Sequence, residues 1–382
     1  MKPLTAIRST VISAYLGENV LRLQRGAQRA IAAMRRKPRV LSFYYRVDDA
    51  QSHLLAQTLS ELADRTSIEI DFIVVPTPHP NANPEPEWLR NHDANDAVLL
   101  AERYDLSFPR DWKMPSDDRI RRVQAALLVP RPPHEQLLRA IELGDALWRD
   151  EGHRLGQIVD EIGTIEGQDV RVRLESNREA LTNSGHYQSA MIFYRGEWYW
   201  GVDRLWHLLS RLADEGVQAG DVLVERPLSV ATVERLRGEV LPKSLDVFFS
   251  FRSPYSYLLI ERIHRDFGHL DSVDLVLKPV LPMVNRGFEI PKEKKMYIVR
   301  DAAREARKRS IRFGKICDPL GKGIERAMAV WLAADSEGKG FAFVHSAMRG
   351  IWSEWNRRFD RPWIAICGRA CDSQCFCRRS RP

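Results

Sequence analysis

Two stretches of the 382-residue chain, about 200 residues apart, carry the same pattern. They are FYYRVDDAQSHLLAQTL (43–59) and FFSFRSPYSYLLIERI (248–263), and Ser52 of the first aligns with Ser256 of the second. An apolar, aromatic run followed by leucines at helical spacing predicts a buried strand that leads into a helix. A repeat of this period is too long for a solenoid, so we expect two tandem domains that begin in the same way.

The order of the strands and helices expected in the first half limits which folds it can form. In sequence order we expect a strand (39–45), a helix (46–65), a strand (67–76), helices (about 88–160) and a strand–turn–strand–helix segment (189–212). The turn falls at Arg195–Gly196, between two short apolar and aromatic runs. This β-α-β, helical insertion, β-β-α order is that of a thioredoxin fold of the DsbA type.

The pattern restarts in the second half, with strands expected at 244–251 and 273–281 and a helix at 253–267. The fold class is therefore α/β, with tandem thioredoxin-like (DsbA-type) domains that each carry a helical insertion. The expected divisions are a basic amphipathic helix (1–37), domain 1 (38–215), a linker (216–243), a truncated domain 2 (244–355) and a Cys/Arg-rich tail (356–382).

The positive charge is concentrated at the two ends of the chain. The net charge is +7, but residues 1–37 alone carry eight Lys or Arg and one Glu, and residues 355–382 carry seven Arg and two Asp. The body between them is mildly acidic, which disfavours nucleic acid as a partner. The N-terminal helix either packs on the first domain or contacts a membrane surface or a partner.

The chain has no features of a membrane or secreted protein. No apolar run approaches the ~20 residues of a membrane span. The N-terminus also lacks the continuous apolar core of a secretory signal. We therefore expect a cytoplasmic protein.

Ser253 and Ser256 stand where a thioredoxin-type redox protein carries the two cysteines of Cys-x-x-Cys. A helix N-terminus presents unpaired N–H groups and a partial positive charge. A hydroxyl there can donate to a sulfur anion without forming a disulfide. The serines therefore favour stabilisation of a bound thiolate over thiol exchange, and the alternative for Ser253 is a plain helix cap.

The segment DVFFSFRSPYSYLLIERI (246–263), with KPVLPMVNRG (278–287) and DPLGKGIERAMA (318–329), resembles the 2-hydroxychromene-2-carboxylate isomerases and kappa-class glutathione transferases. In the first half, Gly201, Asp203, Arg204 and Leu205 match the closing Gly-x-Asp-Arg-Leu of that family. The resemblance implies DsbA-like folds that use glutathione as co-substrate, and no metal.

The family's residue roles carry over to matching positions. Ser253 takes the catalytic place, where it stabilises the glutathione thiolate. The residues implied in binding glutathione or substrate are Pro254, Tyr255, Ser256, Asn285, Arg286, Asp203 and Arg204. Glutathione would add to a small unsaturated substrate derived from an aromatic compound. The oligomeric state is open, and a homo-oligomer is one possibility.

Neither half follows the family pattern completely. In the first half, Ala190 aligns with the family's cis-proline, and a cis peptide before a non-proline costs ~2.5–4 kcal/mol. We therefore expect a trans bond there and an altered glutathione site. Asp48 or Asp49 caps the first helix, where a carboxylate would repel a thiolate. The first half is therefore structural or adapted to another ligand.

The second half ends before its expected hairpin and last helix. Four of the five cysteines lie among arginines at 367, 371, 375 and 377, and their spacing lacks the paired short intervals of a zinc site. The stretch is a metal site, a genuine basic tail or a segment translated out of frame. We expect domain 2 to be left with an open sheet edge.

Three functions remain open from the sequence. The first is a glutathione-dependent isomerase or transferase. The second is a non-catalytic thioredoxin-like protein that binds a partner with both sites degenerate. The third is a DsbA-type thiol-disulfide oxidoreductase, which the missing Cys-x-x-Cys disfavours.

Overall fold

The computed structural model describes residues 14–78, 83, 85–220, 222, 244–266 and 274–354. The chain divides into two compact units. The N-terminal unit is Gly26–Val233, and the C-terminal unit combines Met1–Arg25 with Glu234–Pro382. One break between the units, at Val233–Glu234, falls inside the predicted linker, and the other, at Arg25–Gly26, falls inside the predicted N-terminal helix. Most of the linker and the whole Cys/Arg-rich tail lie outside the described residues.

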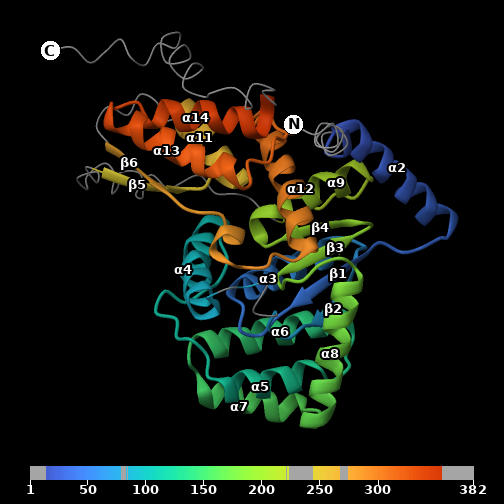
Figure 1. The fold of residues 1–382 in the computed structure, drawn as a ribbon. Helices are drawn as coiled ribbons and strands as arrows, with labels where there is room; N and C mark the ends of the chain where they lie inside the picture. Colours follow the sequence, from blue (N-terminus) through green and yellow to red (C-terminus); the bar gives the residue numbers. More distant parts are fainter. Residues whose placement is uncertain are drawn as a thin grey trace. The chain divides into compact units, whose positions relative to one another are not determined.

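The N-terminal unit follows the predicted β-α-β, helical, β-β-α order (Figure 1). Its elements are β1 (Val40–Tyr45), α3 (Ala50–Arg65), β2 (Glu69–Val74), α4 (Pro86–Tyr104), α5 (Asp117–Leu127), α6 (Pro133–Trp148), α7 (Gly152–Ile162), α8 (Gly167–Asn183), β3 (Met191–Tyr194), β4 (Glu197–Trp200), the 3-10 helix η1 (Val202–Arg204) and α9 (Leu205–Asp214). The five helices α4 to α8 form the helical insertion between β2 and β3.

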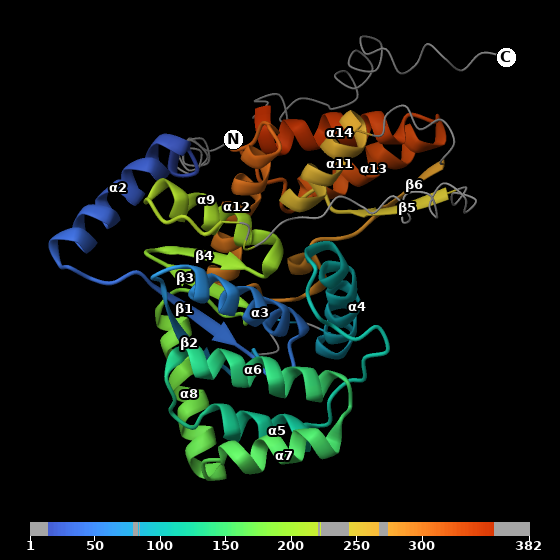
Figure 2. The same cartoon turned by 180° about the vertical axis from the view of Figure 1, so that it is seen from behind.

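The four strands form one sheet in the order β2-β1-β3-β4. β1 and β2 are parallel, whereas β3 is antiparallel to both β1 and β4. The predicted turn between β3 and β4 is confirmed, because Arg195 and Gly196 both have positive φ (42° and 84°), as a tight two-residue hairpin requires. Helices α5 to α8 lie together beyond β2, away from β4 and α9 (Figure 2).

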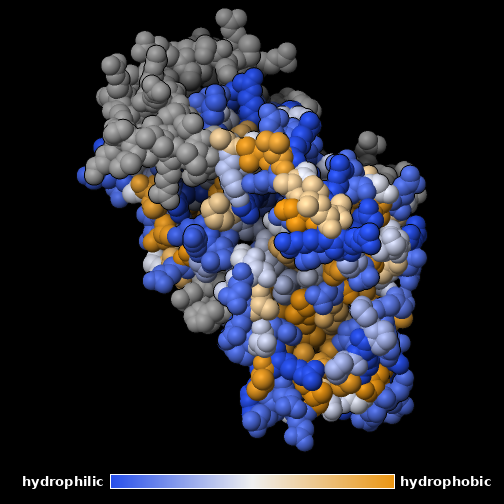
Figure 3. Space-filling model, turned by 90° about the vertical axis from the view of Figure 1, so that its right-hand side faces the viewer, coloured by the Kyte–Doolittle hydropathy of each residue, from blue (hydrophilic) through white to orange (hydrophobic). Residues whose placement is uncertain are grey.

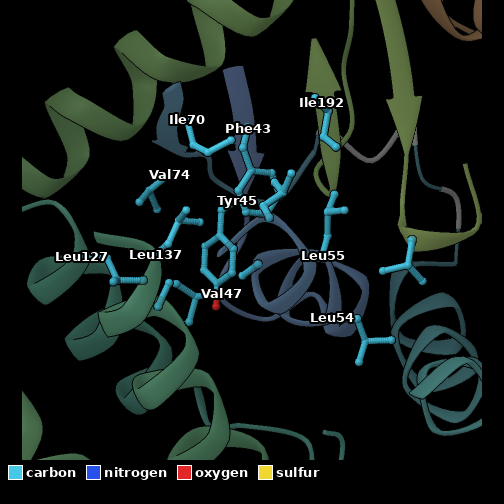
Figure 4. Close-up of a cluster of buried hydrophobic side chains, with 14 of the residues drawn as sticks. Phe43, Tyr45, Val47, Leu54, Leu55, Ile70, Val74, Leu127, Leu137 and Ile192 are labelled. Carbon is cyan, nitrogen blue, oxygen red and sulfur yellow. The ribbon is translucent and has the colours of Figure 1, made fainter. Parts of the chain in front are cut away.

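The core of this unit lies between β1, α3 and the helical insertion. Phe43, Tyr45, Leu54 and Leu55 are fully buried there (Figure 4). Alternate residues of a strand point to the same face, so Leu41, Phe43 and Tyr45 enter the core together. The apolar run that predicted the strand thus supplies the inner face of the sheet.

His53 of α3 is buried against α6. Its Nε2 lies 3.3 Å from Oδ1 of Asp145. Burial acts to raise the pKa of Asp145, but the hydrogen bond and charge of His53 act against it, and the pKa falls below its ordinary value. A Cβ placed on Gly144 would lie only 2.3 Å from His53 Nδ1, so the close approach of α3 and α6 requires glycine here.

The C-terminal unit also begins with a strand, a helix and a strand. Its elements are β5 (Ser244–Phe249), α11 (Pro254–Asp266), β6 (Asp274–Pro279), the 3-10 helix η2 (Met283–Arg286), α12 (Lys292–Lys308), α13 (Lys322–Ser336), α14 (Gly340–Arg349) and the π-helical turn η3 (Gly350–Glu354). β5 and β6 form a parallel two-stranded sheet. Helices α11, α13 and α14 lie on one side of this sheet (Figures 1 and 2).

The sheet of this unit has one packed face. Val247 and Phe249 of β5 point into a core with Phe343 and Trp352, whereas Phe248 between them is 65% exposed. Within the described residues the sheet has only these two strands, so the edges of β5 and β6 carry no further strand there.

The two units begin with equivalent hydrogen bonds. Arg46 N donates to Ser52 Oγ (3.2 Å) in the N-terminal unit, as Ser250 N donates to Ser256 Oγ (3.2 Å) in the C-terminal unit. His53 N donates to Asp49 O (3.2 Å), as Tyr257 N donates to Ser253 O (3.1 Å). Val75 N donates to Tyr45 O (2.8 Å), as Val280 N donates to Phe249 O (2.7 Å). The alignment of Ser52 with Ser256 therefore holds in three dimensions, and Asp49 stands where Ser253 stands.

Within the described residues, the predicted N-terminal helix (1–37) contains α2 (Glu18–Met34). Residues 1–13 lie outside the described residues. Ala32 is the one buried residue of α2, so most of this helix is exposed or half-buried.

Candidate functional site

Ser253 lies between β5 and α11 and caps the helix. Its Oγ accepts a hydrogen bond from Ser256 N at 3.2 Å, and its backbone carbonyl accepts from Tyr257 N. A serine hydroxyl has one donor and two acceptor positions, so a hydroxyl that accepts at its oxygen still has its own O–H to donate. Because Ser253 is only half-buried, this O–H can meet a ligand at the positive end of the helix.

Pro254 and Ser256 shape this turn. Pro254 is the first residue of α11 and is buried, and its missing N–H costs nothing at that position. Ser256 Oγ accepts a hydrogen bond from Ser250 N across the turn. The structure therefore gives Ser256 a positioning role, since its oxygen holds the end of β5 against the start of α11.

Tyr255 is held by a carboxylate of α12. Its hydroxyl donates to Oδ2 of Asp301 at 2.8 Å. Asp301 is fully buried, and its Oδ1 accepts from Nη2 of Arg304 at 3.0 Å and from the hydroxyl of Tyr297 at 3.4 Å. This network fixes a phenol two residues from Ser253.

Arg252 precedes Ser253 and forms a two-bond ion pair with Asp318. Its Nε donates to Oδ1 at 2.8 Å and its Nη2 donates to Oδ2 at 3.0 Å. These hydrogen bonds raise the pKa of Arg252 above its ordinary value, although burial acts against them. Sequence reasoning missed this pair because the two residues are 66 positions apart.

Asn285 and Arg286 lie on η2 and are exposed. The guanidinium of Arg286 stacks over the ring of Phe288 at 5.1 Å. Among the described residues, no hydrogen bond joins either of them to the start of α11. Their predicted contact with glutathione or substrate therefore stays a prediction.

Asp203 and Arg204 lie in η1 of the N-terminal unit and form an ion pair with each other. They belong to a different unit from Ser253, so the seven predicted binding residues do not form one site within a single unit. Asp203 lies near the position where Gly201, with φ of 69°, turns the chain out of β4. Glycine is suited to this backbone conformation.

The equivalent helix start in the N-terminal unit is occupied by the carboxylate of Asp49. Its Oδ1 accepts from Gln51 N at 3.1 Å, and its Oδ2 accepts from the hydroxyls of Ser52 (2.8 Å) and Ser189 (2.7 Å). Asp49 is buried, and three donors from the protein satisfy it. A thiolate approaching this helix would meet a negative charge that already uses the available donors.

Ala190, which follows Ser189, also uses its backbone groups internally. The described peptide bonds are all trans, as expected for a non-proline residue at this place. Its N–H donates to Ser52 Oγ at 3.1 Å and its carbonyl accepts from Gly201 N at 2.9 Å. Its φ of 53° is unusual for alanine. Both backbone groups of Ala190 therefore form hydrogen bonds within the N-terminal unit.

Charged side chains surround the start of α3 at Asp49, where protein donors already satisfy the carboxylate. Nε of Arg46 lies 3.1 Å from Oδ1 of Asp48, and Nη1 of Arg90 lies 3.4 Å from its Oδ2. Burial, and then the nearby charge of Asp49, raises the pKa of Asp93 to about 7. Asp93 therefore changes charge near neutral pH.

Replacing Asp93 with asparagine is expected to stabilise the protein above pH 7. The free energy of unfolding of the variant should also depend less on pH than that of the wild type. Between its ordinary pKa of 3.8 and the folded value of about 7, the folded state binds a proton that the unfolded state has lost. Stability therefore falls as pH rises through this window. Three pKa units correspond to about 4 kcal/mol, and partial solvent exposure reduces this, so we expect a gain of about 1–3 kcal/mol at pH 8.

Urea denaturation at pH 5 and pH 8 measures this effect. Glu102→Gln, a change at an exposed carboxylate on the same helix, is the control and should alter neither curve appreciably. Equal stability of wild type and Asp93→Asn at pH 8 would contradict the raised pKa.

Comparison with known proteins identifies a domain type in the second half of the chain. Residues 244–369 match the model of the family described as the DSBA-like thioredoxin domain. The C-terminal part of the chain is a DsbA-like thioredoxin domain. The match begins at the first residue of β5 and extends past Glu354, the last described residue. It covers Ser253 and the α11 helix start, which places the candidate site in the DsbA-like domain.

Two solved structures resemble part of the chain. One is a 2-hydroxychromene-2-carboxylate isomerase, at 17% identity over 46% of this chain and 96% of that chain, with a TM-score of 0.39. The other is the cytosolic disulfide reductase DsbM from Pseudomonas aeruginosa, at 14% identity over 46% of this chain and 98% of that chain, with a TM-score of 0.30. At these identities and TM-scores, neither structure supports a conclusion about the fold or function of this chain. The comparison with curated proteins found no match.

Three further observations concern the described residues. No three His, Cys, Asp or Glu side chains are grouped there so that they could hold a metal ion. Cys317 is half-buried and lies away from both helix starts in sequence. No helix in this part of the chain is both long and apolar enough to cross a bilayer.

Proposed function

We propose that the DsbA-like domain binds glutathione with its thiolate at Ser253 and acts as a glutathione-dependent isomerase or transferase. The observation that carries this proposal is the hydroxyl of Ser253, which caps α11 and keeps its O–H for a ligand. The partial positive charge of the helix N-terminus favours an anion there. The resemblance of this segment to glutathione-dependent isomerases and transferases supports the same ligand.

The chemistry follows from the stabilised thiolate. A hydroxyl hydrogen bond and the helix dipole favour the charged form of a thiol, so the bound thiol loses its proton at lower pH than in water. The thiolate is the nucleophile that attacks an unsaturated carbon of an aromatic-derived substrate. Tyr255, whose hydroxyl is held by Asp301, follows Ser253 by two residues and is proposed to contact the substrate. Loss of the thiolate from the adduct gives isomerisation, and its retention gives transfer.

The N-terminal unit is proposed to be a second thioredoxin-like domain with a non-catalytic role. Its sheet order and its three hydrogen bonds equivalent to those of the C-terminal unit support the tandem arrangement. Asp49 fills the place of Ser253, which supports a structural role for this unit. Neither helix start has a cysteine at positions 49, 52, 253 or 256, which argues against disulfide exchange.

Glutathione titrated calorimetrically into the full chain tests the function. We expect one binding event, and Ser253→Ala should raise the thiol pKa of bound glutathione by about 1–2 units. A hydrogen bond to a charged group contributes ~1.5–3 kcal/mol, and one pKa unit corresponds to about 1.4 kcal/mol. The thiolate is followed by its ultraviolet absorbance across a pH series.

Ser336→Ala is the control, because Ser336 is exposed on α13. It should bind glutathione as the wild type does. Absence of binding by the wild type, or the same thiol pKa in wild type and Ser253→Ala, would contradict the proposal. A positive result would justify a substrate screen beginning with chromene-type aromatic compounds.

A further inference from the structure

Helix α2 carries an apolar stripe that faces solvent. Residues at three- and four-residue spacing lie on one side of a helix. Along α2 this side consists of Val20, Leu23, Ala27, Ala30, Ile31 and Met34. Leu23 is 73% exposed, Ile31 is 46% exposed and Met34 is 85% exposed. A helix of a water-soluble protein normally buries such a stripe, so its exposure calls for an explanation.

The arginines of α2 lie away from the stripe. Arg22 and Arg29 lie on the side opposite the stripe, and Arg35, Arg36 and Lys37 follow the helix directly. Glu18 is the one acidic residue of the helix and pairs with Arg22. Figure 3 faces the side of the molecule on which α2 is drawn in Figure 1 and shows hydrophobic side chains bordered by hydrophilic ones.

The chain just before α2 is held in place. Nη1 of Arg307 on α12 donates to the carbonyl of Leu16 at 3.1 Å, and the guanidinium of Arg300 stacks over the ring of Tyr15 at 4.7 Å. These contacts involve the residues before the stripe. They secure the helix at its start and leave the stripe itself uncovered.

We propose that α2 binds the surface of a membrane that contains anionic phospholipids. A helix with one apolar side, a Lys/Arg-rich polar side and low overall hydrophobicity lies in the membrane interface with its apolar side inserted. The basic residues match the negative headgroups, and they are attracted before the apolar side chains insert. A second copy of the chain is a poorer occupant, because it would bring a helix of the same positive charge against the first.

Sedimentation of the full chain with vesicles tests this proposal. One vesicle preparation contains phosphatidylglycerol and phosphatidylcholine in equal amounts, and the other contains phosphatidylcholine alone. We expect the protein to bind the first and not the second, and binding to weaken in 1 M salt, where charges are screened within about 3 Å. The double change Leu23→Glu and Met34→Glu should weaken binding at least about tenfold, or about 1.4 kcal/mol.

Leu332→Glu is the matched control, because Leu332 is an apolar side chain of α13 that is 61% exposed. This variant should bind vesicles as the wild type does. The proposal is overturned if the wild type binds neither preparation, or if the double variant binds as tightly as the wild type. It is also overturned if the wild type is a dimer that binds no vesicles and the double variant is a monomer by light scattering, since the stripe would then join two copies.

Discussion

Replacing Arg211 with alanine should destabilise the N-terminal unit by about 3–5 kcal/mol, the usual cost of breaking a buried ion pair. Arg211 is 1% exposed on α9. It lies 3.1 Å from Glu197 Oε1 and 3.4 Å from Glu215 Oε1, and its Nη1 donates to the carbonyl of Tyr194 at 2.9 Å. Its loss would leave two partly or fully buried carboxylates and a carbonyl without this donor, at the junction of β3, β4 and α9.

Urea denaturation measures the loss, and hydrogen exchange with mass spectrometry locates it. Peptides from β3, β4 and α9 should lose protection first. Arg178→Ala is the control, because Arg178 forms an exposed pair with Glu175 and such pairs contribute ~0–1 kcal/mol. Equal effects of the two substitutions would show that Arg211 does not join these elements.

Asp301→Ala is expected to cost the DsbA-like domain a similar amount, about 3–5 kcal/mol. Asp301 is fully buried and accepts hydrogen bonds from Tyr255, Tyr297 and Arg304. Removal of the carboxylate takes away the negative charge 3.0 Å from the buried guanidinium of Arg304, and it removes the acceptor of the Tyr255 hydroxyl. Stability and glutathione binding should therefore fall together.

Two further variants separate charge from hydrogen bonding. Asp301→Asn keeps an oxygen that can accept from Tyr255, so it should retain more of the glutathione affinity than Asp301→Ala at comparable stability. Asp318→Ala removes an exposed carboxylate that is also paired with an arginine, and we expect it to cost less than about 1 kcal/mol. A cost for Asp301→Ala as small as that of Asp318→Ala would show that burial is not the decisive difference.

The local structure of the chain was largely predictable from the sequence. The apolar runs before Asp49 and Ser253, and the leucines after them, predicted both strand–helix starts. The Arg195–Gly196 turn was predicted from its position between two short apolar runs. These features depend on side-chain spacing and on residues that tolerate particular backbone conformations, and neighbours in the sequence determine both.

The residues predicted to bind glutathione or substrate do not all lie together in the structure. Ser253 and Ser256 lie together at one helix start, as their three-residue spacing requires. Asn285 and Arg286 are exposed on η2, and Asp203 and Arg204 belong to the other unit. The sequence could not identify Asp301 or Asp318 as the partners of Tyr255 and Arg252, because 46 and 66 residues separate them.

The sequence by itself determined that two strand–helix starts repeat, that both lack Cys-x-x-Cys, and that a serine caps one and an aspartate can cap the other. Only the tertiary structure decided that the carboxylate of Asp49 accepts a hydrogen bond from the hydroxyl of Ser189, 140 residues away. It also decided that burial among like charges brings Asp93 to a pKa of about 7. The physical reason is that spacing fixes which face of an element a residue occupies, whereas packing of distant elements decides which groups meet there and how much water they retain.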